Sequence, residues 1–226
     1  MDFASVLSKK ASRITTTPAL FSQLENATDG GEGALRSTHY ALVPCDLRET
    51  TALDAALRAA GMDPTAPTFL LSECVMIYMP AENSRAILEW ASRSFPRLAA
   101  VLYENIRPDD AFGAMMIRNF EARGIPLQGI RAHPDLPSQR ARFLDAGLEE
   151  AFSMTMRDVY DDCIRQDEKA RVSRLELFDE FEDWNLLMEH YCLAGGAQGS
   201  DALKMAMQLG RNSVVPSIGI GSASAS

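Results

Sequence analysis

The sequence predicts an α/β fold around a mainly parallel sheet, and three observations support this fold class. The segment 69–79 opens as a short apolar run and is followed by Pro80 and a helical pattern over 81–94. This is the order of a buried strand, a loop and a helix opened by proline. The same order recurs after apolar runs at 39–43 and 98–104. With 226 residues, 46% of them hydrophobic, the chain is long enough for one domain with a substantial core.

Each of the three predicted strands runs into a carboxylate, namely Asp46, Glu73 and Glu104. In open α/β sheets, ligands bind at the carboxyl ends of the strands. Carboxylates there suit hydroxyl and amino groups better than phosphates, which prefer glycines and basic residues. Two explanations of Asp46 and Glu73 remain open, because an acid at a strand end either contacts a ligand or caps a turn.

The first part of the chain is predicted to be a helix followed by a loop. Apolar residues at helical spacing over 3–14 predict the helix, with Asp2 as its N-cap. The segment 15–37 is polar and contains Asp29-Gly-Gly-Glu-Gly33, which indicates a mobile surface loop.

The rest of the chain is predicted to alternate between helices and strands. Helices are expected at 49–60, 109–123, 138–146, 156–166 and 175–181, and strands at 149–155 and 184–194. The final strand is predicted to close the sheet in an antiparallel pair. A disordered tail is predicted over 198–226, with a short helix at about 201–209.

Composition excludes several classes of function. The net charge of −9 argues against a nucleic-acid partner. The acidic stretch from Asp145 to Glu189 accounts for the whole net charge, either as solvated helix faces or as a docking face for a basic partner. No run of about 20 apolar residues predicts a membrane span. The cysteines and histidines are too isolated for a zinc site or a disulfide framework, which favours the cytosol: Cys45, Cys74, Cys163, Cys192, His39, His133 and His190.

Four segments resemble motifs of one known family. They are Tyr40-Ala-Leu-Val-Pro-Cys-Asp-Leu-Arg48, Glu73-Cys-Val-Met-Ile-Tyr-Met79, Val172-Ser-Arg-Leu-Glu176 and Glu189-His-Tyr-Cys-Leu193. The chain resembles the leucine carboxyl methyltransferases from residue 2 to about 197, apart from the predicted loop. These enzymes use S-adenosyl-L-methionine (SAM) to methylate the C-terminal leucine of the protein phosphatase 2A catalytic subunit.

The resemblance implies a class I SAM-dependent methyltransferase fold, a Rossmann-like sheet of seven strands whose last strand is antiparallel. The chain begins where the family's second strand ends. We therefore expect 1–197 to form a partial methyltransferase domain that lacks the first strand or strands.

The resemblance also implies roles for particular residues. Asp2 would hold the ribose hydroxyls of SAM, while Asp46 and Leu47 would hold the adenine. Glu73 would line the SAM pocket, and Tyr78 would face the substrate. No catalytic acid or base is expected, because an α-carboxylate with a pKa near about 3.5 is already ionised at pH 7.

The resulting expectation is a cytoplasmic enzyme that methylates the C-terminal leucine of the phosphatase 2A catalytic subunit. One alternative is a non-catalytic remnant that binds a protein partner through its acidic stretch. Another is a relative of the carboxyl methyltransferase of wybutosine synthesis on transfer RNA, against which the acidic balance argues.

Overall fold

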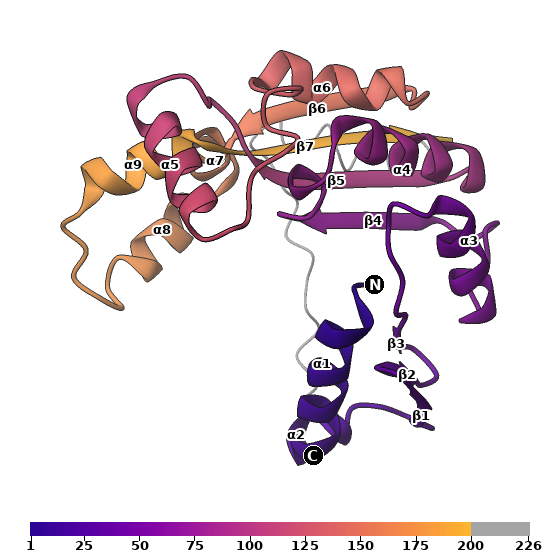
Figure 1. The fold of residues 1–226 in the computed structure, drawn as a ribbon. Helices are drawn as coiled ribbons and strands as arrows, with labels where there is room; N and C mark the ends of the chain where they lie inside the picture. The colour runs from indigo at the N-terminus through magenta and orange to yellow at the C-terminus, as the bar shows by residue number, and fades with distance from the viewer. Residues whose placement is uncertain (200–226) are drawn as a thin grey trace.

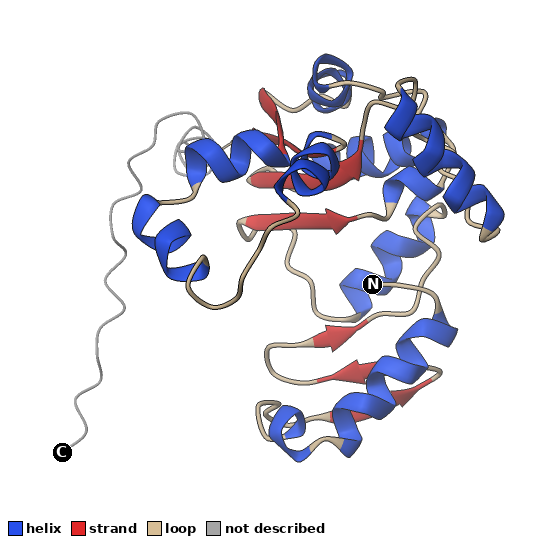
Figure 2. Ribbon diagram, turned by 90° about the vertical axis from the view of Figure 1, so that its left-hand side faces the viewer, coloured by secondary structure: helices blue, strands red, loops and turns tan. Residues whose placement is uncertain are grey.

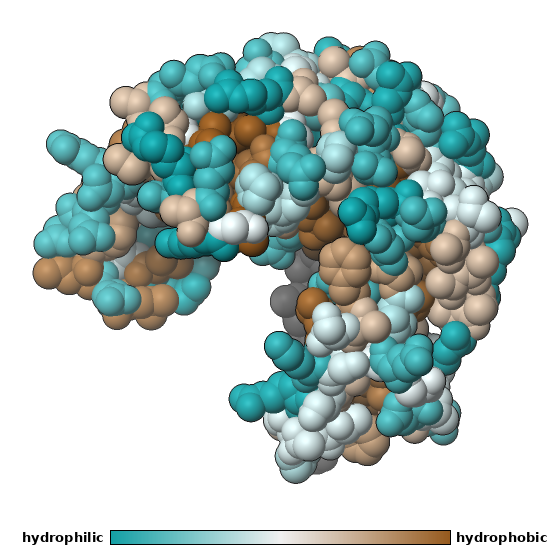
Figure 3. All heavy atoms as spheres, viewed as in Figure 1, coloured by the Kyte–Doolittle hydropathy of each residue, from teal (hydrophilic) through white to brown (hydrophobic). Residues whose placement is uncertain are grey.

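The computed structural model describes residues 1–199, and these residues form two separate sheets with helices around them (Figure 1). The larger sheet has four strands in the order β4-β5-β7-β6, and the smaller has three in the order β1-β2-β3. Figure 2 shows the smaller sheet apart from the larger one. In the space-filling view of Figure 3, the described residues form a crescent with a hollow on its concave side.

The four-stranded sheet confirms the predicted α/β class with an antiparallel last strand. Its members are β4 (Thr68–Glu73), β5 (Leu98–Asn105), β6 (Glu150–Thr155) and β7 (Tyr191–Gln198). β4 and β5 are parallel, whereas β7 is antiparallel to both of its neighbours, β5 and β6. Two of the three predicted strand–helix units therefore lie side by side in one sheet, as expected.

The helices of this larger unit lie between its strands along the chain, and those that contribute to the main core pack on one face of the sheet. The predicted helix over 81–94 is confirmed with the same bounds, and the others agree within a few residues: α3 (Thr50–Ala59), α4 (Ala81–Ser94), α5 (Ala111–Ala122) and α6 (Leu136–Asp145). Asp135 caps α6 in a capping box with Ser138, and Asp110 caps α5 by accepting a bond from the Gly113 backbone.

The two faces of the larger sheet differ in burial. Side chains alternate between faces along a strand, so Leu98, Ala100 and Leu102 of β5 share one face, which we call the inner face. These residues are 0% exposed and pack in a cluster with side chains of α4 and α6. On the opposite face, here the outer face, Phe69 and Leu71 of β4 are 61% and 62% exposed. The core of the sheet therefore lies on the inner face.

The first part of the chain forms its own small unit. It consists of α1 (Ala4–Thr16), α2 (Pro18–Phe21), β1 (Thr28–Gly31), β2 (Ala34–Arg36) and β3 (Ala41–Leu42). Leu7, Leu35 and Leu42 form its core.

Three expectations change in this unit. Phe3, not Asp2, occupies the N-cap position of α1. The segment 15–37 contains α2 and the hairpin β1–β2 instead of loop alone. The strand predicted at 39–43 shortens to β3 and pairs with β2 instead of joining the parallel sheet. Hydrogen bonding across the hairpin satisfies backbone groups that a loop would leave to water.

The acidic part of the chain departs most from the prediction. The helix expected at 156–166 is divided into α7 (Met156–Asp158) and a π-helical turn η2 (Val159–Cys163), and α8 (Gln166–Val172) follows. The prediction of a helix at 175–181 is wrong, because the helix in this part of the chain, α9, spans Phe181–Glu189. The predicted strand at 184–194 begins only at Tyr191, since an apolar run alone does not distinguish a helix from a strand.

The predicted tail begins inside regular structure, because Gln198 is the last residue of β7. The expectations for a disordered tail and for a helix at about 201–209 otherwise lie outside the described residues. Within residues 1–199, every helix is too short or too polar to cross a membrane.

Candidate functional site

A cavity of about 400 Å³ lies between the carboxyl end of β4 and the start of the chain. This volume falls within the usual range of small-molecule sites, roughly 300–1,000 Å³. Its walls come from four places in the sequence: Met1, Asp2, Phe3, Cys45, Asp46, Leu47, Arg48, Cys74, Val75, Tyr78, Met79, Pro80, Asn83 and Gln128. The cavity therefore occupies the place where an α/β sheet is expected to bind its ligand.

Two carboxylates that are far apart in the sequence meet in this cavity. Asp2 forms an isolated parallel bridge with Pro44, and the Cys45 backbone N–H donates to the Asp2 carbonyl at 3.0 Å. This pairing places the start of the chain beside Asp46 and Leu47, so that both acids line the same cavity.

The Asp46 side chain is held by its neighbour Arg48. Its Oδ1 accepts hydrogen bonds from the Arg48 backbone N–H at 3.0 Å and from the guanidinium Nε at 2.9 Å. The side-chain and backbone hydrogen bonds from Arg48 lower the pKa of Asp46 below its usual value. Asp46 is therefore an ionised hydrogen-bond acceptor at neutral pH, and Arg48 holds its side chain in place.

Cys74 joins the end of β4 to the cavity in an uncommon backbone conformation. Its φ of +49° lies in the left-handed region that non-glycine residues rarely adopt, and its N–H donates to the Tyr103 carbonyl at 2.8 Å. Such backbone strain concentrates at functional sites. Burial raises the pKa of the Cys74 thiol to about 11, with further contributions from Glu104 and Glu73. Cys74 is thus a neutral wall residue and not a nucleophile.

The 3₁₀ turn η1 (Met76–Tyr78) contributes to the next wall of the cavity. Residues of the connector after α5 hold this turn through hydrogen bonds. Gln128 Nε2 donates to the Tyr78 carbonyl at 2.9 Å, and the Gly129 N–H donates to the Ile77 carbonyl at 2.9 Å. A Cβ on Gly129 would lie 3.3 Å from the Met79 carbonyl oxygen, so the close approach favours glycine here. These contacts position Tyr78 at the cavity.

The structure brings most of the predicted site residues together. Asp2, Asp46, Leu47 and Tyr78 all line the cavity, whereas Glu73 is exposed at the end of β4 and is not among its lining residues. Several residues that line the cavity were not predicted from the sequence, among them Phe3, Met79 and Gln128. Gln128 lies in a proline-rich connector whose sequence carries no functional signal.

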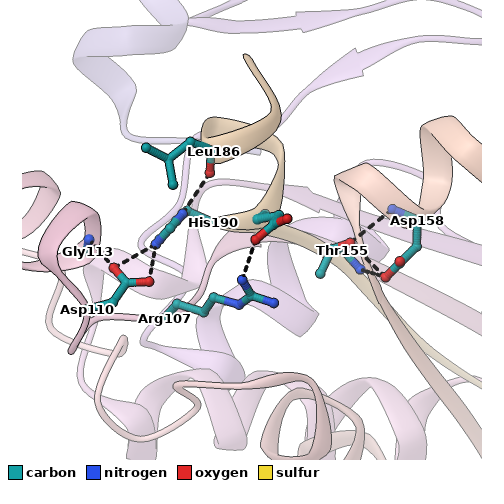
Figure 4. A network of polar contacts seen from close by, with 8 residues as sticks. Arg107, Asp110, Gly113, Thr155, Asp158, Leu186 and His190 are labelled. Carbon is teal, nitrogen blue, oxygen red and sulfur yellow. Dashed lines mark hydrogen bonds and ion pairs between the residues drawn. The ribbon is translucent and has the colours of Figure 1, made fainter. Parts of the chain in front are cut away.

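A separate network of polar contacts supports the start of β7 (Figure 4). His190 is 0% exposed, with Nδ1 at 2.7 Å from the Leu186 carbonyl and Nε2 at 2.9 Å from both carboxylate oxygens of Asp110. Arg107 pairs with Glu189 at 2.7 Å. Both ring nitrogens of His190 therefore face oxygen acceptors, and the residue ties α5 to the start of β7.

The described residues contain no cluster of three or more histidine, cysteine or acidic side chains that could hold a metal ion. A mixed sheet with an antiparallel last strand and a carboxylate-lined cavity at the end of its parallel strands defines the class of the protein. This is the class I, Rossmann-like fold of the SAM-dependent methyltransferases.

Comparison with known proteins gives the particular family. Residues 1–92 match the family model described as leucine carboxyl methyltransferase. A leucine carboxyl methyltransferase 1 homolog from Arabidopsis thaliana is 45% identical over 195 residues, which cover 85% of this chain and 59% of that protein. Leucine carboxyl methyltransferase 1 from Rattus norvegicus is 35% identical over 208 residues, covering 90% of this chain and 62% of that protein.

Another relative has a different name and a greater length. The tRNA wybutosine-synthesizing protein 4 of Homo sapiens is 37% identical over 202 residues, covering 88% of this chain and 29% of that protein. The chain belongs to the leucine carboxyl methyltransferase family. It spans about three fifths of the length of the two relatives that carry the family's name.

Proposed function

We propose that this protein binds SAM in the cavity and transfers its methyl group to the α-carboxylate of a C-terminal leucine. The observation that carries the proposal is the meeting of Asp2 and Asp46 in one cavity at the carboxyl end of β4. The membership of the chain in the leucine carboxyl methyltransferase family supports the reaction type.

The lining residues fit the adenosine part of SAM. Asp2 offers carboxylate oxygens to the ribose hydroxyls, and Asp46 offers them to the adenine amino group while it remains bonded to Arg48. Leu47 and Met79 supply apolar surface for the base. Glu73 is proposed to lie near the cofactor, because the adjoining Cys74 lines the cavity. Glu73 itself is exposed to solvent.

The reaction is a displacement that needs positioning more than proton transfer. SAM, when bound, would supply an electrophilic methyl group, and the bond from this methyl to sulfur would break as the bond to a carboxylate oxygen forms, which leaves a methyl ester and S-adenosylhomocysteine. The attacking carboxylate is already ionised at pH 7, because its pKa is near about 3.5. The residues of the chain therefore act by aligning the two partners and by excluding water. Cys74 and Tyr78, whose pKa values are raised mainly by burial, remain protonated and take no proton from the substrate.

The proposed acceptor is the C-terminus of the protein phosphatase 2A catalytic subunit, methylated in the cytoplasm. The names of two relatives, both leucine carboxyl methyltransferases, support a leucine carboxyl group as the acceptor. Tyr78, which lines the cavity, is proposed to face it. A net charge of −9 suits a protein acceptor better than a nucleic acid.

Equilibrium dialysis of the whole chain against labelled SAM tests the proposal. The variant Asp46→Ala should bind at least about tenfold more weakly, because it loses charged hydrogen-bond acceptors in the cavity. Asp63→Ala is the matched control. Asp63 also accepts a bond from the backbone two residues on, at 2.8 Å from Thr65, but it does not line the cavity.

Equal binding by Asp46→Ala and the wild type would contradict the assignment of the cavity. A folded chain that bound no SAM would favour the alternative of a protein that binds a partner without methyl transfer. The acidic stretch would then become the surface to examine.

A second candidate acceptor rests on the similarity to tRNA wybutosine-synthesizing protein 4. In that case the acceptor would be a carboxyl group on a modified transfer RNA base. Methyl transfer to a leucine-ended peptide and not to transfer RNA would support the first proposal. The reverse result would support the second.

A further inference from the structure

The outer face of the sheet carries a stacked pair of tyrosines whose hydrogen-bonding capacity is unused among the described residues. Tyr103 lies on β5 and Tyr191 begins β7, with Tyr191 opposite Asn105 in the antiparallel register. Their rings are 5.1 Å apart between centroids and 15° from parallel. Both residues are half-buried, and no hydrogen bond of either hydroxyl is found within residues 1–199.

This pair continues the wall of the cavity. Tyr103 pairs with Glu73 in the parallel register, and its carbonyl accepts the N–H of Cys74, which lines the cavity. Tyr78, on the same rim, lies close enough to Tyr191 for the two phenols to interact. Burial raises the pKa of Tyr78, with smaller contributions from Cys74 and Tyr191.

The network in Figure 4 fixes the residue that directly precedes Tyr191. His190 immediately precedes Tyr191, is fully buried, and is held by Leu186 and Asp110. Because the adjoining residue is fixed and the Tyr191 ring is stacked on Tyr103, this ring loses little conformational entropy when a ligand packs on it. Tyr191 is therefore positioned for contact with a ligand, and part of its surface is exposed to solvent.

The chemistry of the stack selects the kind of ligand. Two flat rings offer apolar area to an aliphatic side chain, and phenols offer O–H donors. Burial raises the pKa of Tyr103 to about 12, so it stays neutral and donates at physiological pH. Glu73, opposite Tyr103 on β4, would repel an anion. A bound carboxylate is therefore directed toward the side of Tyr191 and Tyr78.

We propose that the Tyr103–Tyr191 stack is the acceptor side of the site. The aliphatic side chain of a C-terminal leucine packs on the two rings, and the hydroxyls of Tyr191 and Tyr78 donate to its α-carboxylate. This inference rests on the proposed function and adds residues that select the acceptor.

The test measures peptide binding and cofactor binding separately on the whole chain. Fluorescence anisotropy follows a labelled peptide that ends in leucine, and a second peptide whose C-terminus is an amide. Tyr191→Phe should weaken binding of the acid peptide about tenfold, as expected for one lost hydrogen bond to a charged group. It should leave the amide peptide and the dialysis constant for SAM unchanged. Tyr103→Leu should weaken both peptides, because it removes the stack.

Tyr160→Phe is the matched control, since its ring packs on Trp184 away from the cavity. A change common to Tyr160→Phe and Tyr191→Phe, or equal binding of acid and amide peptides by the wild type, would overturn the inference. Binding of SAM without binding of peptide would also overturn it while leaving the cofactor proposal standing. Binding of peptide without SAM, with loss in Tyr191→Phe, would support the acceptor site and refute the proposed methyl transfer.

Discussion

The two faces of the four-stranded sheet both carry apolar side chains, but these side chains are buried on one face and largely exposed on the other. On the inner face, Leu98 and Leu102 are 0% exposed beneath α4 and α6. On the outer face, Phe69 and Leu71 of the neighbouring strand are more than half exposed, and Tyr103 and Tyr191 are half-buried. The difference teaches that apolar strand residues are not all core. One face stabilises the sheet, whereas the other presents apolar and aromatic surface beside the cavity.

The largest expected effect is on the inner face, at its buried ion pair. Arg142 Nη1 lies 2.7 Å from Glu104 Oε2, and the two side chains are 4% and 2% exposed. Arg142→Met leaves the Glu104 charge buried without its partner, so we expect a loss of about 3–5 kcal/mol in the free energy of unfolding. Urea denaturation measures it.

The double variant Glu104→Met with Arg142→Met is the control, because replacing both charges by apolar side chains is often close to neutral. A single variant as stable as the wild type would mean that the pair does not stabilise the inner face. Its place in the sequence would then have another explanation.

The next effect compares two leucines on adjacent strands. Leu102→Ala removes a side chain that is 0% exposed, and we expect a loss of about 2–5 kcal/mol from the cavity that it leaves. Leu71→Ala removes a side chain that is 62% exposed and should change the free energy of unfolding by only about 0.5 kcal/mol. Equal losses, measured in urea, would show that the outer face is covered in solution.

The smallest effect concerns the link between α5 and the start of β7. Asp110→Ala removes the cap of α5 and the partner of His190, with an expected loss of about 1–2 kcal/mol. Asp109→Ala is the matched control. Its ion pair with Arg131 joins side chains that are 75% and 69% exposed, so its loss should be near about 0.5 kcal/mol.

The stability that Asp110 contributes through this link depends on pH. Burial opposes ionisation of Asp110, but hydrogen bonds from Gly113 and His190 outweigh it and lower the pKa of the carboxyl group. A lowered pKa in the folded state contributes stability above the unfolded value of about 3.9, and this stability is lost as the pH falls through the folded value. Thermal unfolding between pH 6 and 3 should therefore show a shallower acid slope for Asp110→Ala. An unchanged slope would refute this account.

In the centre of the chain, the local sequence pattern was enough to predict helices and strands close to their observed bounds. Helix α4 was predicted with its observed bounds, because Pro80 opens it and its apolar residues recur at helical spacing. The same reasoning failed over 175–194, where acidic and apolar residues alternate without caps. There, the boundary between α9 and β7 is set by His190, whose partner Asp110 lies in a distant part of the sequence.

The candidate site shows the same division. The sequence singled out Asp46 and Tyr78 from their motifs, and both line the cavity. Gln128 had no signal, because its role depends on a bond to the Tyr78 carbonyl that only the fold creates.

The sequence by itself determined the α/β class, the acid Glu73 at the end of a parallel strand and the family of the chain. These follow from periodicity, punctuation by proline and glycine, and short motifs, all of which are local. Only the tertiary structure decided that Asp2 and Asp46 line one cavity, that Glu104 is buried against Arg142, and that Tyr103 stacks on Tyr191. These pairings depend on strand order and register, which are set by contacts between distant segments and leave no local pattern.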